Sequence, residues 1–547
     1  MGTATTVADL LEARAGDDAV ALRFEDRSWT WRAFVADCRR VASLASSLRA
    51  GPDALHVGVL LDNTPAFLHW IGGAALAGAA VVGINSTRRG GELATDIRHA
   101  DCRLLVTDGP HRELLRGLDL DLPVLLVDDP SYEERLAAAG PSFAPVGGDH
   151  VLLLLFTSGS TGAPKAVVCT SSRLAAAGVT AAERFGLRGD DVLYEAMPLF
   201  HGNALMANWA PALALGATVA LRRRFSASGF LPDVRRFGAT YCNYVGRALA
   251  YVLATPERPD DADNPLRLAF GTEAPAGDRE RFAARFGCRV VESYGSSEGV
   301  ISILATAGMP PGALGLPPEG TDVAVIDPAT GEECPPARFD AGGRLVNGGA
   351  AVGEIVRRDP GGRFEGYYRN PEADAERRRD GWYWSGDLGY RDADGWFYFA
   401  GRGADRLRVD SENLAAAPIE RVLGRLPGVV VAAVYPVPDP RTGDRVMAAL
   451  ELVPGTPFDP DAFAAGLAAA PDLGTKEGPR FVRVVAAMPL TGSNKVDKGP
   501  LRAAAWRTDD PVWWQPERGG PYRRLTPADV DALAAELARN GRSALAP

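Results

Sequence analysis

One stretch of the chain combines glycine, hydroxyl side chains and a lysine in the way that anion binding requires. After the apolar run Val151 to Leu155, which is typical of a buried strand, come Thr157, Ser158, Gly159, Ser160, Thr161, Gly162, Ala163, Pro164 and Lys165. Glycines let the backbone approach an anion closely, amides and hydroxyls donate to its oxygens, and lysine adds a positive charge. A Walker A loop is excluded because Lys165 follows Pro164 and precedes Ala166. We predict a phosphate-binding loop over 157–165, with an ordinary Gly/Ser turn as the alternative.

The overall composition narrows the class of partner. The 547 residues exceed what one hydrophobic core supports, so two or more domains are expected. A net charge of −10 argues against nucleic acid or an anionic membrane surface as the main partner. Basic clusters at Arg222–Arg224 and Arg377–Arg379 are either solvated faces or contacts to an anion such as a cofactor phosphate.

The cysteines and the N-terminal sequence indicate the compartment. None of the six cysteines has CxxC or metal-knuckle spacing, so neither zinc nor a disulfide framework is predicted. Residues 1–18 lack the apolar core of a signal peptide, and the longest weakly polar run, Trp70 to Ile84, is too short to span a bilayer. The sequence favours a cytoplasmic protein without stable membrane insertion.

The hydrophobic pattern predicts the scaffold that must position the loop. Apolar runs such as Val57 to Leu61 and Ala79 to Ile84 alternate with helical segments such as 65–78, which is typical of parallel α/β architecture. The alternation repeats around 193–222 and 239–270, which indicates a second sheet layer.

Beyond residue 320 the pattern changes to short strands separated by turn signals, and a compact αβ pattern returns after Arg402. We therefore predict an α/β protein with two domains. The first, over 1–404, is a large domain of layered sheets and helices, and the second, over 405–547, is a small α+β domain.

Five later segments contain other residues that could act on a phosphorylated substrate. They are Met197 to Gly202, Gly271 to Pro275, Tyr294 to Gly299, Trp384 to Arg402 and Thr491 to Val496. In this order and at these distances they resemble the adenylate-forming (ANL) superfamily, which includes acyl-CoA synthetases, peptide-synthetase adenylation domains and firefly luciferase. The segment Arg408 to Leu414 is similar to its counterpart in bacterial fatty-acyl-CoA ligases.

The resemblance implies an acyl-CoA synthetase-like fold and an AMP-forming ligase. Such an enzyme uses ATP to convert a fatty or aryl carboxylic acid into acyl-AMP, releases pyrophosphate and transfers the acyl group to CoA. Because two anions meet in the first step, the site needs cations and hydrogen-bond donors around the developing charge.

The resemblance assigns most motif residues to the nucleotide. The loop at 157–165 holds the β- and γ-phosphates, and Glu298 holds Mg²⁺, which prefers hard oxygen ligands. The alternative for Glu298 is an acid in a surface turn. Tyr294 offers a flat face to adenine, and a side chain at Gly271 would obstruct the other face. The residues expected around the base are Gly271, Thr272, Glu273, Ala274, Pro275, Tyr294, Gly295, Ser296 and Ser297.

Two further residues are expected at the sugar and one at the reacting phosphate. By resemblance, Asp387 accepts both ribose hydroxyls and Arg402 assists it, although Asp387 could instead cap a turn. Lys495 is the expected catalytic cation, and it reaches the site only if the small domain closes over it. Lys498 is a nearby competitor for that role.

The acid pocket is expected from segments 201–209, 241–250 and 269–272. The resemblance puts His201 at its mouth, where it orients the substrate carboxylate, although a lone histidine is often structural. Polar groups in these segments hint at an aryl or functionalised acid. The expected pocket residues are His201, Asn203, Tyr241, Asn243, Tyr244, Gly246 and Arg247.

The second half-reaction depends on two positions in the C-terminal part. Asp405 matches the hinge about which the small domain rotates, and Ser411 lies in the CoA channel where the family usually has glycine. Because a serine side chain narrows that channel, the CoA step is in question. One alternative is a CoA-independent diazotase that adenylates nitrite and acts on an aromatic amine. Another is an inactive nucleotide-binding relic.

Overall fold

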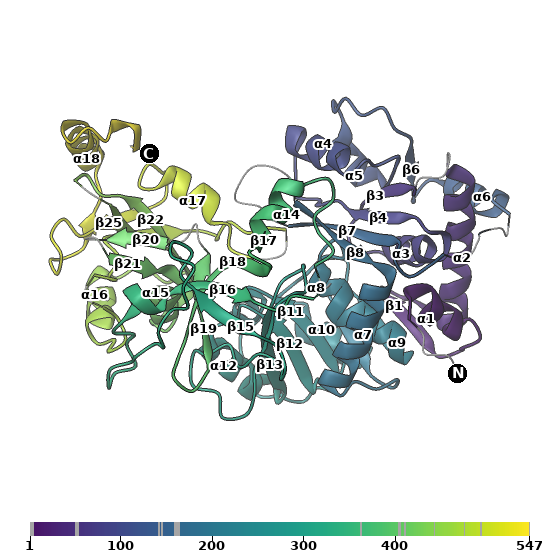
Figure 1. Ribbon diagram of the computed structural model, residues 1–547, viewed down its shortest axis with the longest axis horizontal. Coiled ribbons are helices and arrows are strands. Elements are labelled where there is room, and N and C mark those ends of the chain that lie inside the picture. The colour runs from purple at the N-terminus through teal and green to yellow at the C-terminus, as the bar shows by residue number, and fades with distance from the viewer. Residues whose placement is uncertain are drawn as a thin grey trace.

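The computed structural model describes residues 5–49, 54–140, 143, 146–157, 165–361, 364–402, 406–409, 412–441, 443–474, 476–492, 495–545 and 547. Within this part of the chain, strands form sheets of eight, six, five, five and two strands, and helices cover them. Figure 1 shows the yellow C-terminal elements at the opposite end of the molecule from the purple N-terminal helices. The predicted α/β class is confirmed.

The largest sheet brings two of the predicted motifs side by side. Its order is β14-β13-β12-β11-β9-β10-β1-β2, with parallel pairing from β13 to β1 and antiparallel edges. Because β12 and β13 are parallel neighbours, the motifs that begin at their carboxyl ends lie next to each other. The strands are β1 (Val20–Phe24), β2 (Arg27–Thr30), β9 (Val192–Glu195), β10 (Thr218–Leu221), β11 (Tyr241–Val245), β12 (Leu268–Thr272), β13 (Arg289–Gly295) and β14 (Ser302–Leu304).

The second sheet carries the ends of the predicted phosphate loop. Its order is β6-β5-β3-β4-β7-β8, parallel except for the β7–β8 hairpin, whose last paired residues are Thr157 and Lys165. The residues between them, 158–164, lie outside the described ones, so most of the predicted loop stays a prediction. The strands are β3 (His56–Leu60), β4 (Ala80–Gly83), β5 (Leu104–Thr107), β6 (Val124–Leu126), β7 (Val151–Thr157) and β8 (Lys165–Thr170).

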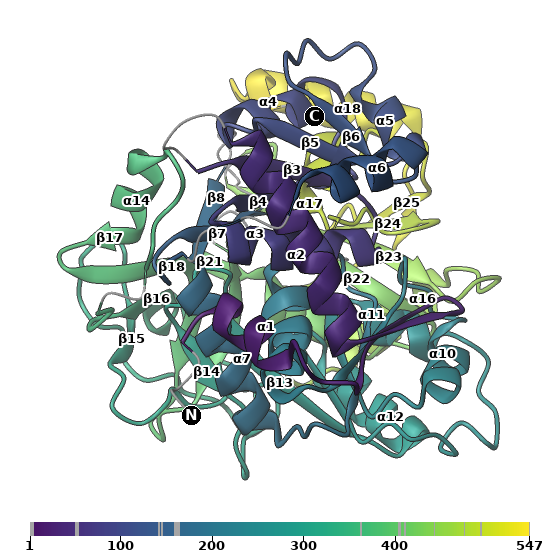
Figure 2. The same ribbon diagram turned by 90° about the vertical axis from the view of Figure 1, so that its right-hand side faces the viewer.

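Helices and a π-helical turn, Leu205–Trp209, accompany these two sheets. Helix α3 shows the usual boundary signals, with Pro65 in its first turn and Gly78 at φ +68° after its end. It packs on α2, which Figure 2 shows in the foreground. The helices are α1 (Val7–Arg14), α2 (Trp31–Leu48), α3 (Pro65–Ala77), α4 (Gly90–His99), α5 (Gly109–Arg112), α6 (Pro130–Ala138), α7 (Ser171–Phe185), α8 (Gly202–Ala204), α9 (Ala210–Leu215), α10 (Phe230–Phe237), α11 (Ala248–Leu253) and α12 (Ala276–Phe286).

A third sheet follows residue 320, where short strands are predicted. In it β18 pairs with β19, which sets Asp387 opposite Arg402 along the backbone. Its elements are β15 (Val323–Ile326), α13 (Gly348–Ala351), β16 (Gly353–Arg357), α14 (Pro371–Arg377), β17 (Arg378–Arg379), β18 (Trp382–Arg391) and β19 (Phe397–Arg402).

The C-terminal part, here called the lid, has hydrophobic clusters of its own, built from residues between Leu407 and Leu537. The boundary at 404/405 itself stays a prediction, since the hinge residue Asp405 lies outside the described residues. The elements are β20 (Arg406–Val409), β21 (Glu412–Ala415), α15 (Ala416–Leu423), β22 (Val429–Pro438), β23 (Asp444–Leu452), α16 (Pro460–Ala468), β24 (Phe481–Val485), α17 (Lys498–Ala504), β25 (Val512–Trp514), β26 (Arg523–Arg524) and α18 (Pro527–Arg539).

Two general features bear on the predicted compartment. Of the helices that the structure describes, none combines the length and the apolar character that crossing a membrane requires. All six cysteines lie in the described ranges, and each is a free thiol.

Candidate active site

The lid lysine reaches the nucleotide motif of the large domain. Lys495 Nζ lies 2.6 Å from Glu273 Oε1, although the two residues are 222 positions apart. A turn fixes Lys495, because the Thr491 amide donates to the Lys495 carbonyl at 2.7 Å. The same turn seats Gly492 so tightly that an added Cβ would lie 2.6 Å from Asn85 Oδ1. The structure therefore brings the predicted catalytic cation to the segment 271–275.

This segment has an unusual backbone and a close protein neighbour. Glu273 has φ +72°, a left-handed backbone conformation that residues other than glycine and asparagine seldom adopt. Gly271 contacts Tyr244, since an added Cβ would lie 2.4 Å from the Tyr244 ring. Glycine at 271 is predicted to leave space for adenine, which a side chain would obstruct. The structure gives a second reason, since Tyr244 by itself leaves no space for a side chain at this position.

The predicted base and ribose residues form a pair. The Tyr294 hydroxyl donates to Asp387 Oδ2 at 2.8 Å. Burial and the neighbouring Asp387 carboxylate raise the pKa of Tyr294, so this hydroxyl keeps its proton. Tyr294 thus holds one oxygen of Asp387, and the strand pairing puts Arg402 on the facing strand.

Helix α14 supports both ends of the predicted phosphate and metal region. Lys165 Nζ lies 2.8 Å from Glu376 Oε2, and Lys165 lowers the pKa of that carboxyl. The Tyr367 hydroxyl donates to Glu298 Oε1 at 2.6 Å and accepts from Arg377 Nε at 3.2 Å. The sequence motifs do not include Tyr367 and Glu376, and only the basic cluster at Arg377 marks their neighbourhood.

The donor set around Glu298 fits Mg²⁺ bound mainly by a nucleotide. Glu298 is buried, and one of its oxygens accepts from Tyr367. The described residues contain no cluster of three or more His, Cys, Asp or Glu side chains that could hold a metal alone. Mg²⁺ commonly takes one or two carboxylates together with phosphate oxygens and waters, so a single carboxylate suffices.

His201 precedes α8 and is held by its own loop. Its amide donates to the Pro198 carbonyl at 2.9 Å, and Asn63 clamps the same loop through the Met197 carbonyl and the Leu199 amide, each at 2.9 Å. Burial and the Lys495 ammonium lower the pKa of His201 to about 3. His201 is therefore neutral near pH 7, and Asn63 is a supporting residue that no sequence motif marks.

The polar side chains of the predicted acid pocket bond mainly to protein groups. Asn243 Nδ2 donates to Asn203 Oδ1 at 2.9 Å, and Asn208 Nδ2 donates to Asn243 Oδ1 at 2.8 Å. The Tyr241 hydroxyl donates to the Ala207 carbonyl at 2.7 Å. Glu195 is fully buried beside Asn243, and burial raises the pKa of its carboxyl well above the usual range. Most of the polar groups expected to face the substrate are therefore hydrogen-bonded to one another or to the backbone.

One predicted pocket residue, Arg247, contacts the lid. Arg247 donates through its guanidinium to the Ala432 carbonyl of lid strand β22 at 3.0 Å, so it is a contact between the large domain and the lid. Its neighbour Gly246 has φ +62° and donates to the Thr272 carbonyl at 3.0 Å. The positive φ requires a flexible residue there, which explains the glycine.

A narrow, mostly apolar cavity lies beside Tyr244, between the largest sheet and helices α10 to α12. The Tyr244 hydroxyl donates to Glu292 Oε1 at 3.2 Å, so the ring is fixed at the cavity wall. The cavity is lined by Tyr194, Ala196, Met197, Phe225, Phe230, Cys242, Asn243, Tyr244, Ala248, Leu249, Val252 and Phe282.

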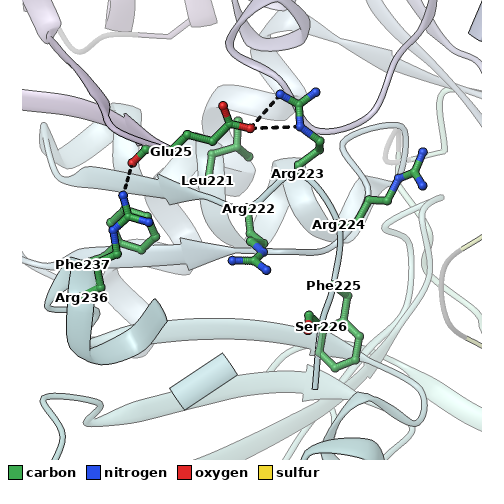
Figure 3. A pocket seen from close by; sticks show the side chains of 9 residues that line it. All are labelled: Glu25, Leu221, Arg222, Arg223, Arg224, Phe225, Ser226, Arg236 and Phe237. Atoms are coloured by element: carbon green, nitrogen blue, oxygen red, sulfur yellow. Dashed lines mark hydrogen bonds and ion pairs between the residues drawn. The ribbon is translucent and has the colours of Figure 1, made fainter. Parts of the chain in front are cut away.

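The basic cluster after β10 lines a separate hollow of about 400 Å³, shown in Figure 3. Its arginines have acidic partners: Arg222 pairs with Asp233, Arg223 with Glu25 and Arg224 with Asp62, at 2.8 to 2.9 Å. Of the two predicted interpretations, the structure favours an ion-paired, solvated face over a cofactor phosphate site.

Fold and geometry together describe a layered α/β domain to which a smaller domain brings a lysine, the arrangement that an adenylate-forming enzyme requires. The family model of the AMP-binding enzyme matches residues 11–368, and that of the AMP-binding enzyme C-terminal domain matches 418–495. The chain belongs to the AMP-binding enzyme family.

Relatives place the chain among the acyl-CoA ligases of this family. It is 52% identical to a steroid-22-oyl-CoA synthetase of Rhodococcus jostii, covering 98% of both chains. It is 48% identical to the medium/long-chain-fatty-acid–CoA ligase FadD17 of Mycobacterium tuberculosis, covering 93% of this chain and 99% of the relative. ATP-bound MatB from Rhodopseudomonas palustris superposes with a TM-score of 0.78 at 25% identity, covering 92% of this chain and 98% of that one.

The predicted function, an AMP-forming acyl-CoA ligase that activates a carboxylic acid as acyl-AMP, is confirmed by these matches. They support the CoA ligase over the diazotase and the inactive relic. The roles of individual site residues stay predictions, and Ser411 lies outside the described residues.

Proposed function

We propose that this ligase activates a carboxylic acid with a large hydrocarbon body, of steroid or fatty-acid type. The observation that carries the proposal is the 52% and 48% identity to relatives named for such substrates. The cavity beside Tyr244 is mostly apolar but holds only about 20 Å³, so it must widen to admit such an acid. An apolar cavity discriminates by shape and by area removed from water. The relatives named for steroid-22-oyl and medium/long-chain substrates support the same class.

In the first step the acid's carboxylate oxygen attacks the α-phosphate of ATP, the bond to pyrophosphate breaks, and acyl-AMP forms. Lys495 supplies positive charge where the attacking carboxylate and the α-phosphate meet. To do so, its ammonium leaves Glu273 and pairs with these two anions instead. His201, being neutral, orients the carboxylate by a hydrogen bond without competing as a second cation.

The remaining residues hold the nucleotide. Asp387, oriented by Tyr294, accepts the ribose hydroxyls, and Arg402 assists from the facing strand. Thr157, Lys165 and the loop between them bind the β- and γ-phosphates. Glu298 would hold Mg²⁺, which would supply positive charge beside the phosphates.

In the second step the CoA thiolate attacks the acyl carbonyl and AMP leaves. The lid, residues 405–547, rotates about Asp405 so that Lys495 withdraws and the segment at Ser411 enters. Two polar contacts hold the lid against the large domain here, namely Arg247 to Ala432 and Tyr251 to Glu451 at 3.4 Å, and the proposed rotation would break them. The free cysteines fit the reducing cytoplasm as the place where this happens.

The test is incubation with ATP, Mg²⁺ and CoA against a panel of steroid acids, medium- and long-chain fatty acids and aryl acids, with an arm of nitrite and aromatic amines. Mass spectrometry identifies the product and a pyrophosphate assay follows the first step. We expect thioesters of steroid or fatty acids. A preference for aryl acids, a diazonium product, or no pyrophosphate from any arm contradicts the proposal.

A further inference from the structure

Glu292 lies between the cavity beside Tyr244 and the predicted nucleotide segment 271–275. It is on β13, and its Oε1 accepts both the Tyr244 hydroxyl, at 3.2 Å, and the Ala274 amide, at 2.5 Å. Tyr244 lines the apolar cavity, whereas Ala274 belongs to the nucleotide segment 271–275. A single carboxylate oxygen therefore holds one group from each substrate's side of the site.

Tyr244 has little freedom to move independently of that segment. Tyr244 is 2% exposed, and its ring lies directly against Gly271, where even a methyl group would not fit. A ligand that pushes on Tyr244 from the cavity therefore acts on Gly271 by contact and on Ala274 through Glu292.

The other oxygen of Glu292 faces an incomplete ion pair. Arg279 Nε lies 3.8 Å from Glu292 Oε2, and this buried Nε has no hydrogen-bond partner among the described residues. Glu273, which is paired with Lys495, is the nearby like charge. Burial raises the pKa of Glu292 to about 7, with Arg279 and the Ala274 amide opposing the rise.

We propose that Glu292 is a positioning residue that couples occupancy of the acid pocket, through Tyr244, to the geometry of the nucleotide-binding segment 271–275. The coupling to the acid rests on the proposed function. The coupling to ATP does not, and it can be measured without any acid.

The experiment measures the ATP dissociation constant of the full-length protein by calorimetry, with Mg²⁺ and without acid or CoA. Glu292→Leu removes both hydrogen bonds, and we expect about tenfold weaker ATP binding. Tyr244→Phe leaves Ala274 bonded but frees Glu292 to shift, and we expect about threefold weaker binding. The double variant should bind no more weakly than Glu292→Leu, because both changes act through one oxygen.

The matched control is Tyr132→Phe, which removes another buried tyrosine hydroxyl, 3.0 Å from Trp70 Nε1 and outside the site. We expect an unchanged ATP dissociation constant for it. Unchanged ATP binding in both Glu292→Leu and Tyr244→Phe, with only a lower melting temperature, overturns the proposal.

Glu292→Gln keeps the proposal testable if the leucine variant does not fold. Glutamine accepts the same hydrogen bonds but does not ionise. The ratio of its ATP dissociation constant to that of the wild type cancels the titration of ATP itself. We expect the ratio to rise about threefold from pH 6 to pH 8, because only the wild type gains a charged acceptor. A flat ratio overturns the proposal, whereas absent thioester formation with these ATP results intact overturns only the proposed function.

Discussion

The lysines of the predicted nucleotide half and the amides of the predicted acid half have different kinds of partner. In the nucleotide half, Lys495 and Lys165 are paired with carboxylates, Glu273 and Glu376, that are themselves about half exposed. In the acid half, Asn243 and Asn208 are buried and bonded to protein groups. Because these carboxylates are partly solvated, an incoming phosphate can replace them at small cost. The acid half instead uses its polar groups to fix the shape of a wall.

The largest expected effect tests the nucleotide half at Lys495. Lys495→Ala should lower the rate of pyrophosphate release by about 10²–10³-fold, because its charge acts mainly in the transition state, and should leave ATP binding nearly unchanged. The matched control is Lys498→Ala, since Lys498 is paired with Glu420 inside the lid at 2.9 Å. Near-normal turnover of Lys495→Ala would remove this residue from the mechanism.

A second prediction concerns Asp387, which tests whether this half recognises ribose. Asp387→Asn should weaken ATP binding by about 1.5–3 kcal/mol, the scale of hydrogen bonds to a charged group. Tyr294→Phe is the companion variant, and its loss should be smaller because it removes only the orienting bond. Calorimetry gives both values, and equal ATP affinity in Asp387→Asn and the wild type means that Asp387 is structural.

A third prediction concerns a charged group near the predicted acid half, His111, which unlike Lys495 is almost fully buried with its partners. His111 lies between Asp108, at 2.6 Å, and Asp62, at 3.5 Å, next to the clamp residue Asn63. These carboxylates raise the pKa of His111 to about 9. Because the folded pKa is above the usual 6.5, the stabilisation is complete below about pH 6.5 and is lost as pH rises through 9.

The variant His111→Gln should therefore lose about 1–2 kcal/mol of unfolding free energy at pH 6 and much less at pH 9.5. Urea unfolding at the two pH values measures the difference. An equal loss at both values would show that the charge of His111 contributes nothing.

The smallest predicted effect lies at Ser411, outside the described residues. Ser411→Gly should raise the rate of the thioester step by roughly twofold to fivefold and leave pyrophosphate release unchanged, because only the CoA channel widens. Single-turnover assays separate the two steps. Unchanged CoA kinetics would show that serine does not narrow the channel.

Much of the scaffold could be predicted from the sequence because it rests on local patterns. The predicted apolar runs Val57 to Leu61 and Ala79 to Ile84 and the helical segment 65–78 lie within one residue of the bounds of β3, β4 and α3. The N-terminal strands β1 and β2 were not predicted. Strand β1 pairs with β10, which follows it by almost 200 residues, and no local sequence pattern in either strand predicts that pairing.

The candidate site divides in the same way. Residues within spaced motifs, such as Asp387 and Lys495, could be named, because glycine and charge stand out at fixed offsets. Glu376, the partner of Lys165, and Glu292, the partner of Tyr244 and Ala274, could not be named. Each is a single acidic residue whose neighbours are set only by tertiary packing. Arg247 follows the predicted pocket strand, and its guanidinium donates to a lid carbonyl, a contact that the sequence could not indicate.

The absence of a side chain at Gly492 allows the lid to approach the large domain closely. Asn85 cannot step aside easily, since its Oδ1 already accepts from the Thr87 amide and hydroxyl at 2.9 and 2.8 Å, and Phe200 abuts the same spot. One methyl group at position 492 would therefore clash with Asn85 and Phe200 and keep the ammonium of Lys495 away from the carboxylate of Glu273.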